Sequence, residues 1–105
     1  MISTNTEATI TATTAKHLFS LGQTYITPGA IDALGEAGQG VVEFINRHQR
    51  GDWGDLGEED KAENNYSVDK RLRIFSAYHT SKGVKLWVIT EADRSATTIL
   101  LPSEY

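Results

Sequence analysis

The chain has 105 residues, a formal net charge of −4 and no cysteine. This length suits one domain with a single helical layer on one sheet. The acidic balance argues against binding of nucleic acid through its phosphates, which needs a basic surface, and the lack of cysteine excludes disulfides and thiolate zinc sites. There is no signal-peptide pattern and no apolar stretch long enough to span a bilayer, so we expect a cytoplasmic protein with no membrane contact and no cofactor.

The first 16 residues are rich in Thr and Ala and contain too few apolar side chains to pack on their own. We expect residues 1–16 to form a flexible arm and residues 17–105 to form a single α+β domain. The alternation of Thr with Ile and Ala over residues 9–13 would give an edge strand if a partner strand were present.

Three helices are expected after a short extended segment. Thr27 followed by Pro28 marks the first start, because Thr caps a helix and Pro suits its first position. Gly38 ends that helix and Gly40 opens the next, and a run of acidic residues from Glu58 favours the start of a third. The sequence predicts extended chain at residues 23–26 and helices at residues 27–37, at 40–49, and from 58 to between 66 and 71.

The remaining residues read as three strands, at residues 72–79, 84–91 and 96–101, joined by tight turns. The expected fold is therefore α+β, with two to three N-terminal helices packed on a C-terminal three-stranded antiparallel β-meander. If His79 pairs with Val84 and Thr90 with Ala96, both faces of the sheet are apolar. One face then carries Ile74, Trp87, Ile89, Ile99 and Leu101, and the other carries Phe75, Ala77, Leu86, Val88 and Leu100.

One helical layer covers only one face of such a sheet. The second face therefore needs another cover, either from the arm together with residues 18–21 or from a second copy of the protein. We favour the homodimer.

The turn between the last two strands is the first candidate site. It holds two carboxylates and a guanidinium, which would serve as an acid/base pair or as an anion site. The alternative, which we favour, is a turn that its own side chains stabilise. The residues concerned are Thr90, Glu91, Asp93, Arg94 and Ser95.

A second candidate surrounds the end of the second helix. His48, with an Asp near it, is a candidate general base, although a His on an apolar helix face is more often a core residue. Between the two aspartates, Trp53 is expected to plug the core. The cluster comprises Arg47, His48, Asp52, Trp53 and Asp55.

Metal and nucleotide sites have no support. The acidic residues between 52 and 63 do not have the spacing of a calcium loop, and the three histidines lie far apart without metal-ligand spacing. There is no P-loop, dinucleotide fingerprint, serine-hydrolase elbow or zincin motif.

Two segments carry a resemblance to a known family. Gly51-Asp52-Trp53-Gly54 and the run from Thr90 to Ser95 resemble a family of small bacterial proteins carried on plasmids, integrative elements and phages, often labelled plasmid-related protein. The resemblance covers residues 18–105 and implies no particular activity. Some members bear the label of a type I restriction-modification subunit, but this chain lacks a methyltransferase's glycine motif and Asn/Asp-Pro-Pro-aromatic motif.

Three functions follow as hypotheses. The leading one is a small accessory protein of a mobile element that binds a protein partner, or itself, through the second sheet face. The alternatives are an acidic anti-restriction mimic of DNA, and an enzyme or binding protein for a phosphate-containing or nucleic-acid ligand. The second alternative requires that Arg94, Glu91, Asp93, Asp52 and His48 converge.

Overall fold

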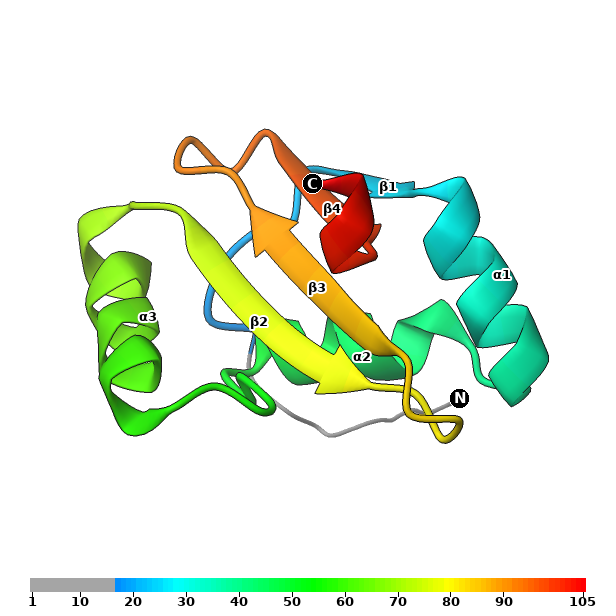
Figure 1. The fold of residues 1–105 in the computed structure, drawn as a ribbon. Helices are drawn as coiled ribbons and strands as arrows, with labels where there is room; N and C mark the ends of the chain where they lie inside the picture. The colour runs from blue at the N-terminus through cyan, green and yellow to red at the C-terminus, as the bar shows by residue number, and fades with distance from the viewer. Residues whose placement is uncertain (1–16) are drawn as a thin grey trace, which may run out of the picture.

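A computed structural model describes residues 17–105 as three helices and a four-stranded mixed sheet (Figure 1). The α+β class is confirmed. The prediction of a flexible arm falls on residues 1–16, which lie outside the described residues. The elements in chain order are β1 (Gln23–Ile26), α1 (Pro28–Ala37), α2 (Val41–Gln49), α3 (Glu58–Lys70), β2 (Ile74–His79), β3 (Lys85–Thr90), β4 (Ala96–Leu100) and the 3-10 turn η2 (Pro102–Glu104).

The helices begin and end where the sequence predicts. The Thr27 side chain accepts a hydrogen bond from the Ala30 N–H at 3.3 Å, and Pro28 occupies the first turn. Gly38 takes the left-handed conformation that ends α1, and Gly40 precedes α2. These bounds are set by local chemistry, so the sequence alone predicts them.

The sheet contains a strand that the three-stranded prediction lacked. Its order is β1-β4-β3-β2, and β1 runs parallel to β4, while the other pairs are antiparallel. The Gln23 N–H donates to the Ser95 carbonyl at 3.0 Å, and the Thr27 N–H donates to the Ile99 carbonyl at 3.0 Å. Residues 23–26 become a strand only through this distant pairing, which no local pattern reveals.

The predicted strand register was wrong by one residue at both turns. His79 pairs with Lys85 and Thr90 with Thr97. The first turn includes Val84, because the Thr80 N–H donates to the Val84 carbonyl and the Thr80 hydroxyl accepts from the Val84 N–H. The strand pairing therefore starts one residue later than predicted, at Lys85. A slip of one residue moves a strand's side chains to the opposite face. The inner face therefore carries Ile74, Tyr78, Leu86, Val88 and Ile99, and the outer face carries Phe75, Ala77, Trp87, Ile89 and Leu100.

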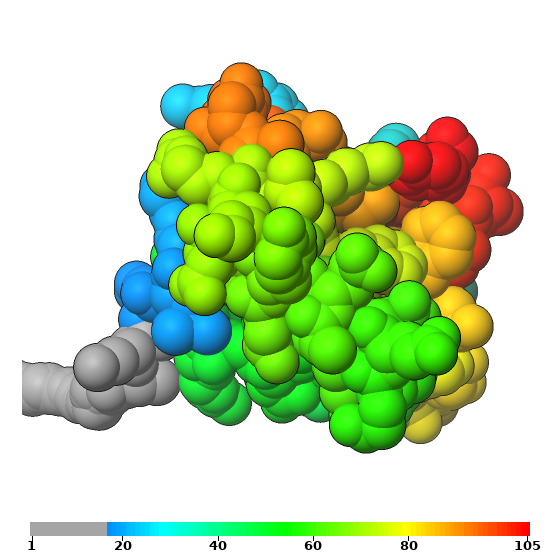
Figure 2. Space-filling model, turned by 90° about the vertical axis from the view of Figure 1, so that its left-hand side faces the viewer, coloured from blue at the N-terminus to red at the C-terminus, as the bar shows by residue number. Residues whose placement is uncertain are grey.

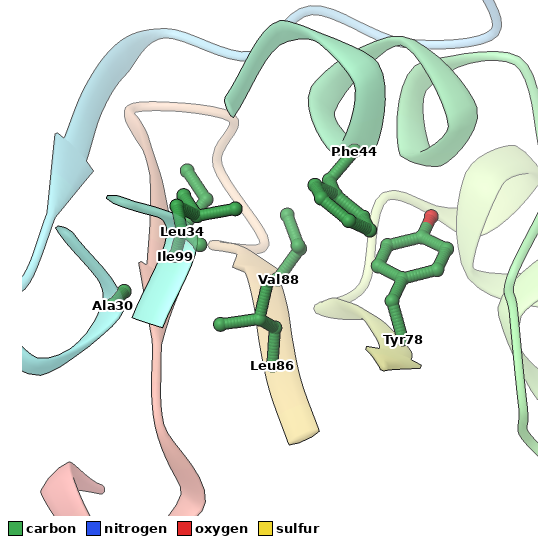
Figure 3. Packing of buried hydrophobic residues seen from close by; sticks show 7 residues of the cluster. All are labelled: Ala30, Leu34, Phe44, Tyr78, Leu86, Val88 and Ile99. Atoms are coloured by element: carbon green, nitrogen blue, oxygen red, sulfur yellow. The ribbon is translucent and has the colours of Figure 1, made fainter. Parts of the chain in front are cut away.

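The main core lies between the inner face and the first two helices. Leu34 and Phe44 pack from α1 and α2 onto Tyr78, Val88 and their neighbours (Figure 3). In Figure 1, α2 passes behind the sheet while the C-terminal turn lies in front of it. The outer face is therefore free of α1 and α2.

A second cluster extends the core at the end of α2. Trp53 is 3% exposed, which confirms its predicted burial, and its ring stacks on Phe19. Residues 18–21 belong to this inner side, because the Leu18 N–H bonds the Gln49 carbonyl and Phe19 contacts His48. The alternative in which residues 18–21 help to cover the second face is therefore wrong for these residues.

The β2 edge of the sheet is closed by groups from outside the sheet. The Asn64 amide both donates to the Phe75 carbonyl, at 2.6 Å, and accepts from the Phe75 N–H, at 3.1 Å. Two residues along, the Ala77 N–H donates to the Trp53 carbonyl and the Ala77 carbonyl accepts from the Asp55 N–H. Figure 2, which looks onto this side, shows α3 at the surface, and α3 contacts β2. No further strand can pair at these positions.

We expect Asn64→Asp to lower the free energy of unfolding by about 3 kcal/mol, because a nearly buried carboxylate would replace the donor that the Phe75 carbonyl needs. Urea unfolding followed by circular dichroism measures this loss. The control is Asn65→Asp, since Asn65 serves Trp53 only as an acceptor and a carboxylate keeps that role. Equal stability of the two variants would show that the Asn64 bridge contributes nothing.

Candidate functional site

Arg94 holds the tip of the last hairpin in place. Arg94 is 7% exposed, and its backbone is in the left-handed conformation, with φ of 62°. Its guanidinium donates to the carbonyls of Leu72, at 2.8 Å, and Ser67, at 3.0 Å, and to those of Glu91 and Ala92 in its own turn. The group predicted as an anion ligand thus ties the turn to the end of α3 and the start of β2.

The other residues of this tip do not converge on one site. Asp93 is exposed, and its carboxylate accepts from the Ser95 N–H at 2.9 Å. Hydrogen bonds from Ser95 lower the pKa of Asp93. Glu91 is exposed, whereas Thr90 is fully buried on the inner face. These are the contacts of a turn that its own side chains stabilise.

His48 is the centre of a buried polar chain. It is 0% exposed, and its two ring nitrogens lie 2.5 Å from the Ser76 hydroxyl and 2.9 Å from the Thr90 hydroxyl. The Thr90 hydroxyl lies 2.7 Å from that of Thr97, which donates to the Leu21 carbonyl at 2.7 Å. Burial lowers the pKa of His48 to about 3, so the ring is neutral in the folded protein.

The Thr97 end of this chain of hydrogen bonds fixes which atom donates and which accepts in each of them. A carbonyl only accepts, so the Thr97 hydroxyl must donate to Leu21. Thr97 then accepts from Thr90, and Thr90 accepts from the Nε2–H of His48. The Nδ1 of His48 is left as the acceptor for the Ser76 hydroxyl. Both ring nitrogens are used inside the core, so His48 has no free position for a substrate.

The predicted charged cluster sits near the other end of β2. Arg47 binds Asp52 with 2.7 Å between Nε and the carboxylate, and this bond raises the pKa of Arg47 and lowers that of Asp52. The Arg47 guanidinium also lies 4.5 Å from the centre of the Tyr78 ring. Asp55 contacts His79 at 2.7 Å on the surface. Each carboxylate therefore has a cationic or imidazole partner of its own.

The two predicted clusters do not converge into one site. Arg94 reaches the Leu72 carbonyl before β2 begins, whereas Trp53 and Asp55 pair with Ala77. Five residues of extended chain, at roughly 3.3 Å each, separate these points by about 16 Å. The two clusters are linked inside the core by the buried contact between His48 and Thr90.

A pocket on the outer face is the remaining candidate. Three aromatic side chains form its walls, with the Phe75 and Trp87 rings 5.0 Å apart and the Trp87 and Tyr105 rings 5.7 Å apart, each pair close to perpendicular. The Arg73 guanidinium lies 5.4 Å from the centre of the Tyr105 ring. The pocket encloses about 330 Å³ and is lined by Arg73, Phe75, Trp87, Ile89 and Tyr105.

Glu104 positions one wall of this pocket. Its carboxylate accepts from the Thr27 hydroxyl at 2.5 Å, from the Gly29 N–H at 2.9 Å and from the Leu101 N–H at 2.9 Å. These bonds lower the pKa of Glu104 and fasten η2 to the start of α1. Tyr105 is thereby held beside Trp87.

Sequence reasoning missed this pocket because the wrong register placed Phe75 and Trp87 on opposite faces. The signal available in the sequence was the alternation Arg73, Phe75 in one strand and Trp87, Ile89 in the next. That pattern is useful only when the pairing of Ala77 with Trp87 is known.

The fold and the pocket define a small α+β protein with an aromatic depression on one sheet face. In comparisons with protein-family models, curated proteins and solved structures, nothing matches this chain. Within residues 17–105 no helix has the length and apolar character needed to cross a membrane. In the same part of the chain no three His, Asp or Glu side chains are grouped to hold a metal ion.

Proposed function

We propose that this chain is a protein-interaction module that binds its partner through the outer face of the sheet. The observation that carries the proposal is the aromatic pocket beside Arg73. Arg73 forms no ion pair with a carboxylate of residues 17–105, unlike Arg47 and Lys61. The pocket thus combines apolar walls with an available positive charge.

This composition is typical of protein-binding surfaces. Trp, Tyr and Arg are enriched among the residues that contribute most to binding energy, and they act in pockets from which water is excluded. Trp87 and Tyr105 line this pocket together with Arg73, and buried Ile89 lies beneath. Arg94, His48 and Asp52, which the enzymatic alternative requires, are instead engaged in internal contacts, which favours binding over chemistry.

The pocket also defines the chemistry of its partner. Its volume of about 330 Å³ lies at the lower end of the range for ligand pockets, ~300–1,000 Å³, which suits one bulky apolar side chain. A carboxylate next to that side chain would pair with Arg73. We therefore propose a partner segment with an aromatic or leucine side chain adjacent to Asp or Glu.

The biological setting of this function rests on the resemblance to proteins of plasmids and phages. On that basis we propose an accessory role in a mobile element, with the partner supplied by the element or by its host. The enzymatic alternative has no observation of its own in favour of it, since the residues that it requires do not converge.

Selection from a random peptide display library tests the proposal. The native protein should enrich peptides in which a bulky apolar residue stands next to an acidic one, and Trp87→Ala should abolish the enrichment. Arg73→Glu reverses the charge beside the pocket, so it should change the neighbouring preference from acidic to basic. The control is Lys82→Glu, a charge reversal in the exposed β2–β3 turn, which should leave the preference unchanged.

Two results would refute the proposal. One is equal enrichment on the native protein and on Trp87→Ala, which would place binding elsewhere. The other is enrichment without acidic residues that Arg73→Glu leaves unchanged. Competition of the selected peptides by adenosine monophosphate, but not by phosphate alone, would instead favour a nucleotide as the ligand of the pocket.

A further inference from the structure

The two edges of the sheet differ in how their backbone groups are satisfied. At the β2 edge, Asn64, Trp53 and Asp55 bind the outward groups of Phe75 and Ala77. Within residues 17–105 no comparable contact is present at the β1 edge, where residues 23–25 are exposed. Figure 1 shows β1 at the margin of the sheet, with α1 leading away from its end.

The direction of the free groups on β1 follows from its pairing with β4. The N–H groups of Gln23 and Thr27 point into the sheet, toward the carbonyls of Ser95 and Ile99. Backbone groups alternate along a strand, so Thr24 and Ile26 direct theirs outward. Within residues 17–105 these outward groups form no hydrogen bond with another segment. An open edge of this kind is a template for another strand.

We propose that a second copy of this chain occupies the edge, with β1 of each copy paired antiparallel to β1 of the other. The argument is the self-complementarity of the strand. When Tyr25 pairs with Tyr25 of the second copy, Thr24 of each copy faces Ile26 of the other. This register uses both outward N–H groups and both outward carbonyls of each copy. Pairing centred on Thr24 or on Ile26 would leave outward groups without a partner.

The same register buries an exposed aromatic side chain. Tyr25 is 55% exposed and shares the outer face with Thr98, its neighbour in β4. Directly opposite residues in a pair without mutual hydrogen bonds have close side chains, so the two Tyr25 rings would pack together across the two-fold axis. The dimer would be a continuous sheet with both outer pockets on one side. This edge dimer differs from the homodimer expected from the sequence, which would cover the second sheet face, and it is independent of the proposed function of the pocket.

A proline scan of the edge tests the dimer. Thr24→Pro removes an outward N–H that has no partner within the described chain, and proline is tolerated in edge strands. Sedimentation equilibrium should show a dimer for the native protein and for Thr24→Val, and a dimerisation constant weakened at least tenfold for Thr24→Pro. Thermal unfolding of dilute Thr24→Pro should match that of dilute Thr24→Val. The pocket variant Trp87→Ala should remain dimeric, which separates this interface from the peptide site.

Cysteine crosslinking supplies a second test, because a loss of stability in the variant cannot by itself produce the expected crosslink. The chain has no cysteine, so Tyr25→Cys would introduce a single thiol on the two-fold axis. Cα atoms of such a pair lie about 4.5 Å apart, within the ~4.4–6.8 Å that a disulfide spans. Tyr66→Cys on α3 is the control, because Tyr66 is also 55% exposed. Mild oxidation should crosslink Tyr25→Cys rapidly and Tyr66→Cys slowly. A monomeric native protein, a fully dimeric Thr24→Pro, or equal crosslinking of the two cysteine variants would overturn the proposal.

Discussion

Gly54→Ala is expected to lower the free energy of unfolding by about 3–5 kcal/mol. Gly54 has φ of 78°, which costs an L-residue roughly 1–2 kcal/mol. A Cβ atom there would lie 2.0 Å from the Ala77 carbonyl oxygen and 2.6 Å from the Tyr78 ring. The loop would have to move away from β2, which breaks the two bonds that join Ala77 to Trp53 and Asp55, each worth about 1 kcal/mol.

The matched control is Gly83→Ala. Gly83 has φ of 82°, but a Cβ atom there would have nothing within 4 Å. Its expected loss is therefore the conformational cost alone, about 1–2 kcal/mol. Urea unfolding of both variants measures the difference. If the two substitutions cost the same, the close approach of Gly54 to Ala77 does not hold the loop on the sheet edge.

Acid should destabilise the protein through His48, beginning as the pH falls below 6.5. The pKa of His48 is about 3 in the folded protein against 6.5 for an ordinary histidine, so the unfolded chain binds the proton more tightly. The stabilisation is complete above pH 6.5 and is lost as the pH falls toward 3. At ~1.4 kcal/mol per pKa unit, the total is as much as about 5 kcal/mol, a large share of a typical stability of ~5–15 kcal/mol.

Urea unfolding at pH values between 6.5 and about 5.5 isolates this effect, because the stabilisation from Asp52 and Glu104 is lost only near and below their ordinary pKa values of 3.8 and 4.5. His48→Asn should be less stable at neutral pH, since Thr90 loses its donor, and its stability should vary little over this range. A native protein whose stability is constant between these pH values would contradict the buried neutral His48.

Asn64 and His48 show why the candidate sites were hard to predict. Both are polar residues whose partners are distant in sequence, at Phe75 for Asn64 and at Ser76 and Thr90 for His48. A sequence gives the chemistry of a side chain but not whether its hydrogen-bonding capacity is already used. Arg94 illustrates the same point. The sequence suggests that its guanidinium binds an anion, but in the structure the guanidinium donates to four backbone carbonyls.

The α+β class, the bounds of the three helices and the presence of β2, β3 and β4 can be predicted from the amino-acid sequence. Thr27, Pro28 and Gly38 act on their own turns, and the strands follow from runs of apolar residues. Tertiary structure alone decided the register, the pairing of β1 with β4 and the outer pocket. The physical reason is range: capping and propensity act over a few residues, whereas pairing depends on distant segments. A register slip of one residue then reverses which side chains are buried.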